Sequence, residues 1–213
     1  GLSLICADSH TCTQGAFGAL AWGVGTTDLE HALATKTLKL RKPLNMRVIL
    51  KGLWPPDVSA KDAILAIISK FGASHGNGYA IEFSGPATEE LEMEDRMTLC
   101  NMAVEFGAFT AIIQPDHKVI SWLKDRPYSP NSETQGIKDH LAELFSDKEA
   151  IFDAEINFDV TSLKPFISWG SSVDQSIPID GLIQEQDNSD IPALNYMSLS
   201  TGMHLLGLKI DGA

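Results

Sequence analysis

The chain has 213 residues, 44% of them hydrophobic and 21% charged, and carries a formal net charge of −12 at pH 7. This composition is that of a globular protein with a sizeable core, and the length allows one or two domains. The acidic balance argues against nucleic acid as a partner, because phosphate binding needs clustered Lys and Arg, and no apolar run reaches the roughly 20 residues that span a membrane.

Apolar runs and helical patterns alternate from the start of the chain. Residues 2–6 (LSLIC) are expected to form a buried strand that delivers polar residues at its C-terminal end. The stretch 13–24 is rich in Gly and Ala, which would let a helix pack closely on neighbouring backbone, although each Gly costs about 1 kcal/mol of helix stability. Thr26 or Thr27 then caps a helix with the sequence TTDLEHALATKTL.

The central part of the chain continues this alternation. Strands are expected at 46–52, 79–85 and 109–113. Helices are expected at 60–72, 94–106 and 116–126, and Ser59 is the expected cap of the first. Alternation of this kind is typical of a parallel or mixed sheet that is covered on both faces, so the sequence predicts an α/β fold.

The C-terminal part is less regular. Residues 127–136 have the composition of a linker, and a helix is expected at 137–146. Residues 150–160 alternate apolar and polar side chains as a half-exposed strand does. The stretch 170–192 reads as a mobile polar loop, and a weak helix followed by a strand is expected over 196–213.

Asp8, Ser9 and His10 bring a carboxylate, a hydroxyl and an imidazole together in three consecutive residues. These groups supply an acceptor, a nucleophile or donor, and a proton carrier. Consecutive residues at a strand end cannot all face one way, so the three cannot form a self-contained triad. Taken alone, the tripeptide is better explained by a strand-to-helix turn in which Asp8 or Ser9 caps the following helix, since such caps are common.

Asn101 and Glu105 are four residues apart on a predicted helix that is otherwise largely apolar, and at this spacing they share one face. A carboxylate in apolar surroundings is costly unless it is paired. One interpretation pairs Glu105 with a nearby arginine such as Arg96. The other makes Glu105 a buried carboxylate that orients a catalytic histidine.

The cysteines Cys6, Cys12 and Cys100 form a sparse, odd-numbered set without a CxxC motif. Their spacing does not resemble a zinc site or a ferredoxin-type cluster, so they are expected to be small buried hydrophobic side chains. The set argues against a disulfide framework and for a reducing compartment. Because the first residues also lack the features of a signal peptide, the sequence predicts a cytoplasmic protein.

Two long blocks carry a resemblance to a known family. The block at 5–38 reads ICADSHTCTQGAFGALAWGVGTTDLEHALATKTL, and the block at 76–108 reads GNGYAIEFSGPATEELEMEDRMTLCNMAVEFGA. Both closely resemble blocks of the aconitase superfamily, in the same order, and the first favours its isopropylmalate dehydratase branch. The resemblance runs from residue 2 to about residue 130 and continues more loosely through LKPFISWGSS at 163–172 to the end.

The resemblance implies a fold of three αβα layers with mixed or parallel sheets, of which this chain holds an incomplete part. It divides the chain into the C-terminal part of domain 1 (1–45), an α/β domain 2 (46–126), and a linker with the start of the next α/β domain (127–213).

The resemblance also implies chemistry. The family carries a [4Fe–4S] cluster in which one iron without a protein ligand acts as a Lewis acid. The whole enzyme would be a hydro-lyase that isomerises 2-isopropylmalate to 3-isopropylmalate in leucine biosynthesis. Asp8 would lie near the open iron, Ser9 would contact substrate and His10 would be held by Glu105, while Asn101 would hydrogen-bond near the cluster without being a ligand.

On this resemblance the chain is an internal fragment of a large subunit, whose partner is a small subunit. The cluster cysteines of the family lie downstream of this chain, and the arginines that bind substrate carboxylates lie largely outside it, so no metal ligand is expected here. We expect the isolated chain to bind no cluster, to be inactive and to expose apolar faces through which it could dimerise.

Two alternatives remain open. Homoaconitase and citraconate-type hydratases share the quoted signatures, and the choice of substrate is expected to depend partly on the small subunit. A non-catalytic binding module that reuses the fold is an alternative of another class. Some relatives of aconitase bind RNA, but a net charge of −12 argues against RNA here.

Overall fold

The computed structural model describes residues 2–124, 126–127, 129, 141, 143–168, 172–181, 183–184 and 210–211. The helices are the 3-10 helix η1 (Thr11–Phe17) and the α-helices α1 (Thr26–Thr35), α2 (Ala60–Phe71), α3 (Pro86–Glu90), α4 (Met93–Met102) and α5 (His117–Leu123). The strands are β1 (Ser3–Cys6), β2 (Leu20–Gly23), β3 (Leu44–Lys51), β4 (Tyr79–Ser84), β5 (Thr110–Ile113), β6 (Ala154–Asp159), β7 (Phe166–Ser168), β8 (Ser176–Pro178), β9 (Ile183–Gln184) and β10 (Ile210–Asp211).

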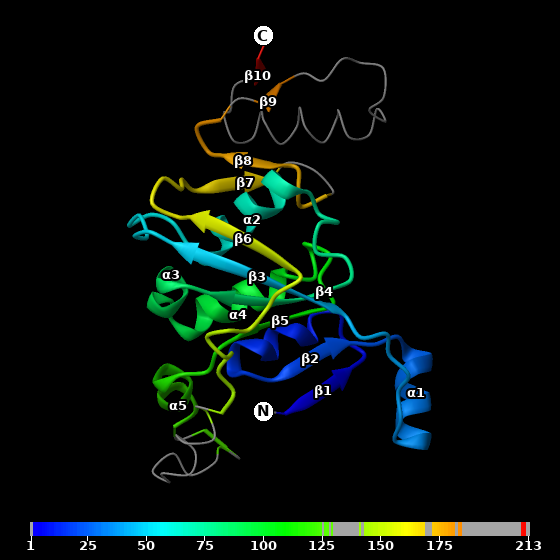
Figure 1. Ribbon diagram of the computed structural model, residues 1–213. Coiled ribbons are helices and arrows are strands. Elements are labelled where there is room, and N and C mark those ends of the chain that lie inside the picture. Colours follow the sequence, from blue (N-terminus) through cyan, green and yellow to red (C-terminus); the bar gives the residue numbers. More distant parts are fainter. Residues whose placement is uncertain are drawn as a thin grey trace, which may run out of the picture.

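A parallel sheet with the strand order β5-β4-β3-β6 lies at the centre of the described structure (Figure 1). In β3, Met46, Val48 and Leu50 are buried and alternate with side chains of the other face, as the two-residue period of a strand requires. The helices between β3, β4 and β5 supply the crossovers that parallel pairing needs. The predicted α/β class with a parallel sheet is therefore confirmed, and β6 extends this sheet beyond the boundary proposed at residue 126.

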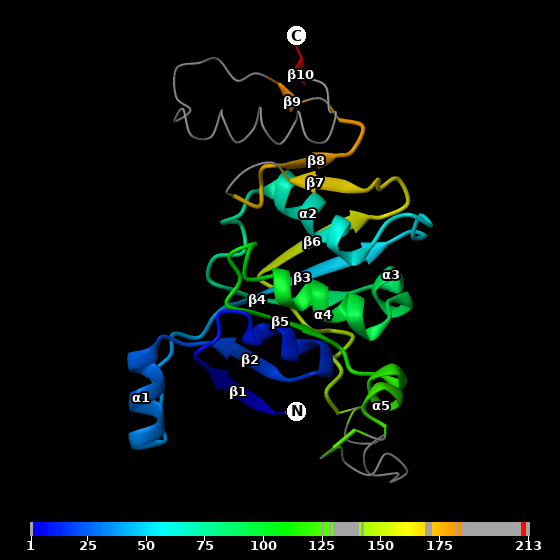
Figure 2. The same cartoon turned by 180° about the vertical axis from the view of Figure 1, so that it is seen from behind.

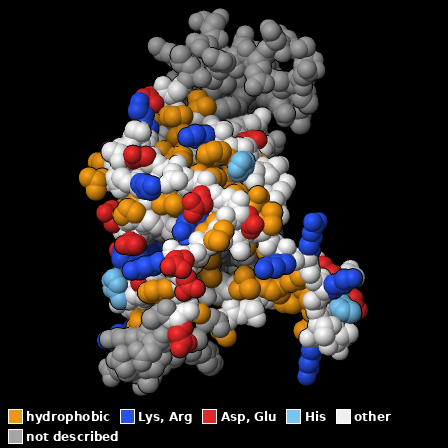
Figure 3. Space-filling view, in the orientation of Figure 1, with side chains coloured by type: hydrophobic (Ala, Val, Ile, Leu, Met, Phe, Trp, Pro, Cys, Tyr) orange, Lys and Arg blue, Asp and Glu red, His pale blue; other side chains and the backbone are white. Residues whose placement is uncertain are grey.

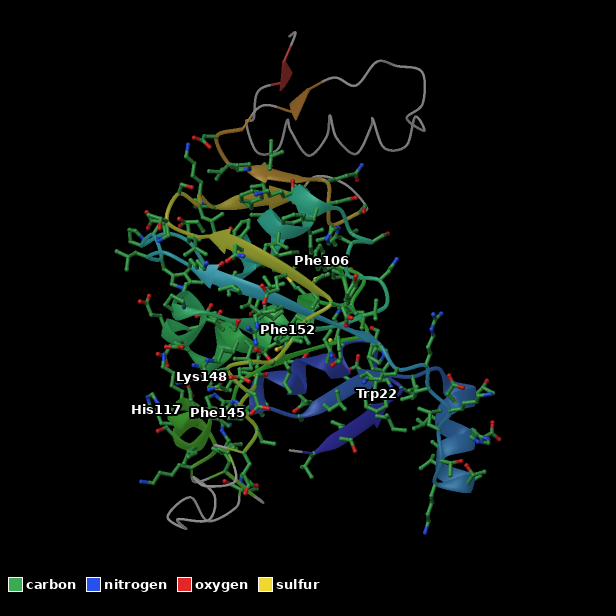
Figure 4. All side chains as sticks on the ribbon, in the orientation of Figure 1. Trp22, Phe106, His117, Phe145, Lys148 and Phe152 are labelled. Carbon is green, nitrogen blue, oxygen red and sulfur yellow. The ribbon has the colours of Figure 1, made fainter. Side chains whose placement is uncertain are left out.

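The second face of the sheet is polar. Arg47 lies 3.6 Å from Glu82 of β4 and 3.7 Å from Glu155 of β6. The ring of Phe152 covers the same guanidinium, with its centroid 3.7 Å from Cζ, and Figure 4 shows Phe152 in front of the strands. In the described residues, the irregular segment 143–153 crosses this face while α2 and α4 lie on the other (Figure 2), so two of the three expected layers are present.

Helix α2 begins at a capping box, and its cap is Ser59, as predicted. The Ser59 backbone N–H donates to the Asp62 carboxylate, and the carboxylate also accepts from the Phe166 backbone N–H at 2.7 Å. Burial alone would raise the pKa of Asp62, but the hydrogen bonds from Ser59 and Phe166 hold it below its usual value. The Asp62 carboxylate thus stabilises the first turn of α2 and also binds the backbone of β7 to this helix.

The N-terminal region packs against β5 through very close backbone contacts. β1 and β2 form a parallel pair connected by η1, and Thr110 donates its hydroxyl to the carbonyl of Ala21. A Cβ added at Gly15 would lie 1.8 Å from the carbonyl oxygen of Ala111, so only glycine lets η1 lie this close to β5. The stretch 13–24 is therefore not one helix as predicted, because a 3-10 turn and a strand give this contact instead.

The prediction that residues 2–6 are buried is wrong. Leu2 is 78% exposed and Leu4 is 43% exposed, because β1 pairs only with β2 in the described structure. Helix α1 has no buried residue, and Leu33 on it is 74% exposed. In Figure 1 α1 stands away from the sheet, and Figure 3 shows hydrophobic side chains on the surface between the two. An uncovered apolar face of this kind agrees with the expected exposure of apolar surface in a fragment.

Most other predicted elements are present, with two differences. The helix predicted over 94–106 ends at Met102. Strand β8, which pairs with β7, lies within the stretch 170–192 that was predicted as a loop. The helix predicted at 137–146 and the helix near the C-terminus lie outside the described residues. No described helix has the length and hydropathy that crossing a bilayer requires.

Candidate functional site

His10 is held at both ring nitrogens. Its Nδ1 lies 2.9 Å from the Ser9 hydroxyl oxygen, and its Nε2 lies 3.2 Å from Oε1 of Glu105. A carboxylate accepts only, so Nε2 carries the proton in the neutral ring and Nδ1 accepts from the Ser9 hydroxyl. The structure therefore joins Ser9, His10 and Glu105 in one hydrogen-bonded chain.

Asp8 acts on the backbone of the same turn. Its carboxylate accepts from the His10 backbone N–H at 3.0 Å, and its carbonyl accepts from the Thr11 hydroxyl at 2.6 Å. The Asp8 side chain thus stabilises the turn, but the N-cap of η1 is His10 and no side-chain hydrogen bond caps it, so the prediction that Asp8 or Ser9 caps the helix is wrong. A Cβ at Gly23 would lie 2.6 Å from the Asp8 carbonyl oxygen, so glycine at the end of β2 is what allows the turn to lie there.

Asn101 reaches the His10 turn through Thr13. The Asn101 amide donates to the Thr13 hydroxyl at 2.9 Å, and that hydroxyl donates to the His10 carbonyl at 2.7 Å. The Cys12 thiol is 3.7 Å from the Asn101 carbonyl oxygen. Helix α4 and the turn are thereby joined by side chains as well as by packing, which fixes where the imidazole lies.

Glu105 lies just beyond α4 rather than within it. Backbone bonds with three-residue spacing, from Glu105 to Met102 and from Phe106 to Ala103, tighten the chain after the helix ends. The Glu105 side chain is 39% exposed, which corrects the expectation of a buried carboxylate. Arg96 pairs with Asp116 instead, so the pairing of Glu105 with an arginine is wrong and the contact with a histidine is present.

A cavity of about 320 Å³ lies beside this chain of hydrogen bonds. Three of the predicted site residues line it, namely His10, Asn101 and Glu105. The other lining residues are Lys61 and Leu65 of α2, Met102 at the end of α4, Ser168 of β7, and Ser172 and Val173 after it. Asp8 and Ser9 are not among the lining residues, so they reach the cavity only through His10.

The arrangement can hold and move a proton next to a small polar ligand. An imidazole whose tautomer is fixed by a carboxylate is a general acid–base group, and the carboxylate stabilises the imidazolium that forms when the ring takes up a proton. Glu105 and Ser9 provide the two contacts that this requires. Hydroxyl and amide groups on the other walls can orient a ligand by hydrogen bonds.

The three cysteines do not fit a metal or cluster site. Cys12 and Cys100 are buried as expected, but Cys6 is exposed, so the expected burial is wrong for Cys6. Burial raises the pKa of both buried thiols, most strongly that of Cys100. A thiol must lose its proton to bind iron. In the described ranges, no group of three or more His, Cys, Asp or Glu side chains could hold a metal ion.

Sequence reasoning missed Thr13, Lys61 and the two serines of the cavity. Thr13 lies in the same block as His10, but nothing in its spacing indicates that it bridges to Asn101. Lys61 follows the cap of α2 and comes to the cavity only through the packing of α2 on α4. A lysine in the first turn of a helix is unfavourable for the helix dipole. This unfavourable position was the one feature of the sequence that could have marked Lys61 as a functional residue.

Comparisons with known proteins place the chain in a family. The sequence matches the aconitase family (aconitate hydratase) over residues 1–213. It is 47% identical over 212 residues to the 3-isopropylmalate dehydratase large subunit of Bacillus cereus (strain G9842) and 46% identical over 212 residues to that of Bacillus thuringiensis (strain Al Hakam). Each alignment covers 99% of this chain and 46% of the relative, so the chain spans about half the length of these curated relatives.

Proposed function

This chain belongs to the aconitase family, and we propose that it is part of the large subunit of a 3-isopropylmalate dehydratase. The reaction would be the dehydration of 2-isopropylmalate and the rehydration of the alkene to 3-isopropylmalate, a hydro-lyase step of leucine biosynthesis. The observation that carries the proposal is the identity of 46–47% over 99% of the chain to large subunits of that name. The contact between His10 and Glu105 beside a cavity supports it.

In this proposal the side chains of the chain hold and move a proton. His10 takes up a proton at Nδ1, the atom to which the Ser9 hydroxyl donates in the neutral ring. Glu105 accepts the hydrogen bond from Nε2–H and stabilises the imidazolium. Asp8 keeps the turn in place through the His10 backbone N–H. Asn101, which reaches the His10 turn through Thr13, would hydrogen-bond near the cluster without being a ligand.

The whole enzyme would contain more than this chain. A [4Fe–4S] cluster would supply a Lewis acid for the substrate hydroxyl, but the cysteines of this chain do not fit its ligand set, so the ligands would come from outside it. A small subunit would complete the enzyme, and cytoplasmic localisation would suit a chain whose buried thiols remain free.

The proposed substrate is tested with the assembled enzyme. A full-length large subunit containing this chain, combined with its small subunit, is assayed with 2-isopropylmalate and with homocitrate by the absorbance of the conjugated alkene. Preference for 2-isopropylmalate is the expected result. Preference for homocitrate would mean that the chain is part of a homoaconitase instead. If the enzyme with a loaded cluster turned over neither substrate, the proposal would be contradicted.

The isolated 213-residue chain is expected to bind no cluster and to be inactive, because its thiols are either buried and protonated or solitary. Iron and sulfide are measured after anaerobic reconstitution, with the full-length large subunit treated in parallel as the control. A stoichiometric [4Fe–4S] signal on the isolated chain would overturn this expectation.

A further inference from the structure

One cation of the cavity has no role in the site described so far. Lys61 is exposed, lines the cavity with His10 and belongs to the first turn of α2, after the cap at Ser59. A positive charge at this end of a helix opposes the helix dipole, so local helix stability does not explain it.

Lys61 also lacks a local counter-ion. Within the described residues no hydrogen bond or ion pair to its ammonium is found. Its neighbour Asp62 is occupied, because its carboxylate accepts from the Ser59 backbone N–H at 2.8 Å and from the Phe166 backbone N–H at 2.7 Å. The ammonium therefore remains available to a ligand in the cavity.

The other groups around the cavity favour an anion. Asn101, Ser168 and Ser172 offer amide and hydroxyl donors, and Glu105 is the one carboxylate among the lining residues of the described structure. That carboxylate is engaged with the imidazole of His10 at 3.2 Å. A carboxylate ligand would thus meet donors and an unpaired ammonium rather than a repelling charge.

We propose that Lys61 is a substrate-binding residue whose ammonium binds one carboxylate of a small dicarboxylate while His10 faces the reacting end. The inference rests on the proposed function, because it takes the cavity as the place where a hydroxy-dicarboxylate binds. It adds a carboxylate contact from within this chain to those expected from elsewhere in the enzyme.

The test compares Lys61→Met, which keeps the length and removes the charge, with Lys61→Arg and with Lys70→Met. Lys70 lies in the last turn of the same helix and is not a lining residue, so it controls for net charge. In the assembled enzyme, Lys61→Met is expected to raise KM for 2-isopropylmalate about tenfold with a much smaller change in kcat. Lys61→Arg should restore most of the affinity, and Lys70→Met should leave KM unchanged.

A second measurement keeps this inference separate from the proposed reaction. Succinate is titrated calorimetrically into the same cluster-loaded proteins, and Lys61→Met is expected to weaken its binding about tenfold. If the wild-type enzyme did not turn over 2-isopropylmalate, the proposed function would fail, and weaker succinate binding in Lys61→Met would still support the carboxylate site. Equal succinate binding by Lys61→Met and wild type, or an equal loss in Lys70→Met, would overturn the role of Lys61.

Discussion

Replacing His10 by asparagine should lower kcat of the assembled enzyme by about 10²–10⁴-fold, which is the usual loss when a general acid–base group is removed. The imidazole contacts the Ser9 hydroxyl at 2.9 Å and Glu105 at 3.2 Å, and an amide cannot carry a proton between them. Steady-state rates with 2-isopropylmalate, followed by the absorbance of the alkene, measure the effect. A wild-type kcat in this variant would mean that His10 is not a general acid–base group of the reaction.

Glu105→Gln should reduce kcat by a smaller factor, about 10–100-fold, because the amide still contacts the ring but cannot stabilise the imidazolium. Glu92→Gln is the matched control, since Glu92 is an exposed carboxylate that pairs with Lys118 away from the cavity. The side chains of His10 and Glu105 are 37% and 39% exposed, so neither change is expected to unfold the protein, and circular dichroism checks this. Equal rates for Glu105→Gln and Glu92→Gln would mean that Glu105 does not position the ring.

The central α/β region was predictable because each of its elements is specified locally. Helix α2 has a capping box at Ser59 and an apolar face, and β3 has buried residues at every second position, so pattern and cap indicate the same structure. The region before β3 was not predictable in this way. Its contacts depend on Gly15 lying against Ala111, and a glycine in the sequence does not indicate which backbone it approaches.

The site itself was predictable only in part. The pairing of His10 with Glu105 came from a family resemblance, because the carboxylate alone favoured an arginine partner such as Arg96. The bridge through Thr13 and the place of Lys61 depend on how α4 and α2 pack, which is a long-range property that local patterns do not contain. The end of α4 at Met102 reflects three-residue bonds in the next turn, and helical periodicity does not predict that change.

Asp116→Ala should lower the free energy of unfolding by about 3–5 kcal/mol, the cost of leaving a buried charge without its partner. Arg96 is 1% exposed, and one of its terminal nitrogens lies 2.6 Å from the Asp116 carboxylate. Its other bonds go to the backbone carbonyls of Leu91 and Glu89, which supply no negative charge. Urea unfolding of the chain, with Ser121→Ala at an exposed position of α5 as the control, measures the difference.

Asp116→Asn should cost less than Asp116→Ala, because the amide keeps an acceptor for Arg96 and for the Lys118 backbone N–H that caps α5. The double variant Arg96→Met/Asp116→Asn should be more stable than the sum of the single changes predicts, since it removes the buried charge together with its partner. Strict additivity of the two single variants would show that Arg96 and Asp116 do not stabilise each other.

The pair of Arg96 and Asp116 also predicts how the free energy of unfolding depends on pH in acid. Burial alone would raise the pKa of Asp116, but the hydrogen bond and charge of Arg96 outweigh burial and hold that pKa below its usual value. A carboxyl group whose folded pKa is depressed stabilises the fold above its unfolded pKa of about 3.9, and this contribution is lost as pH falls through the folded pKa. The difference in unfolding free energy between wild type and Asp116→Asn should therefore be constant near neutral pH and shrink below about pH 4. Parallel pH curves for the two proteins in acid would contradict the role assigned to Arg96, because they would mean that the ionised carboxylate gains nothing from the guanidinium.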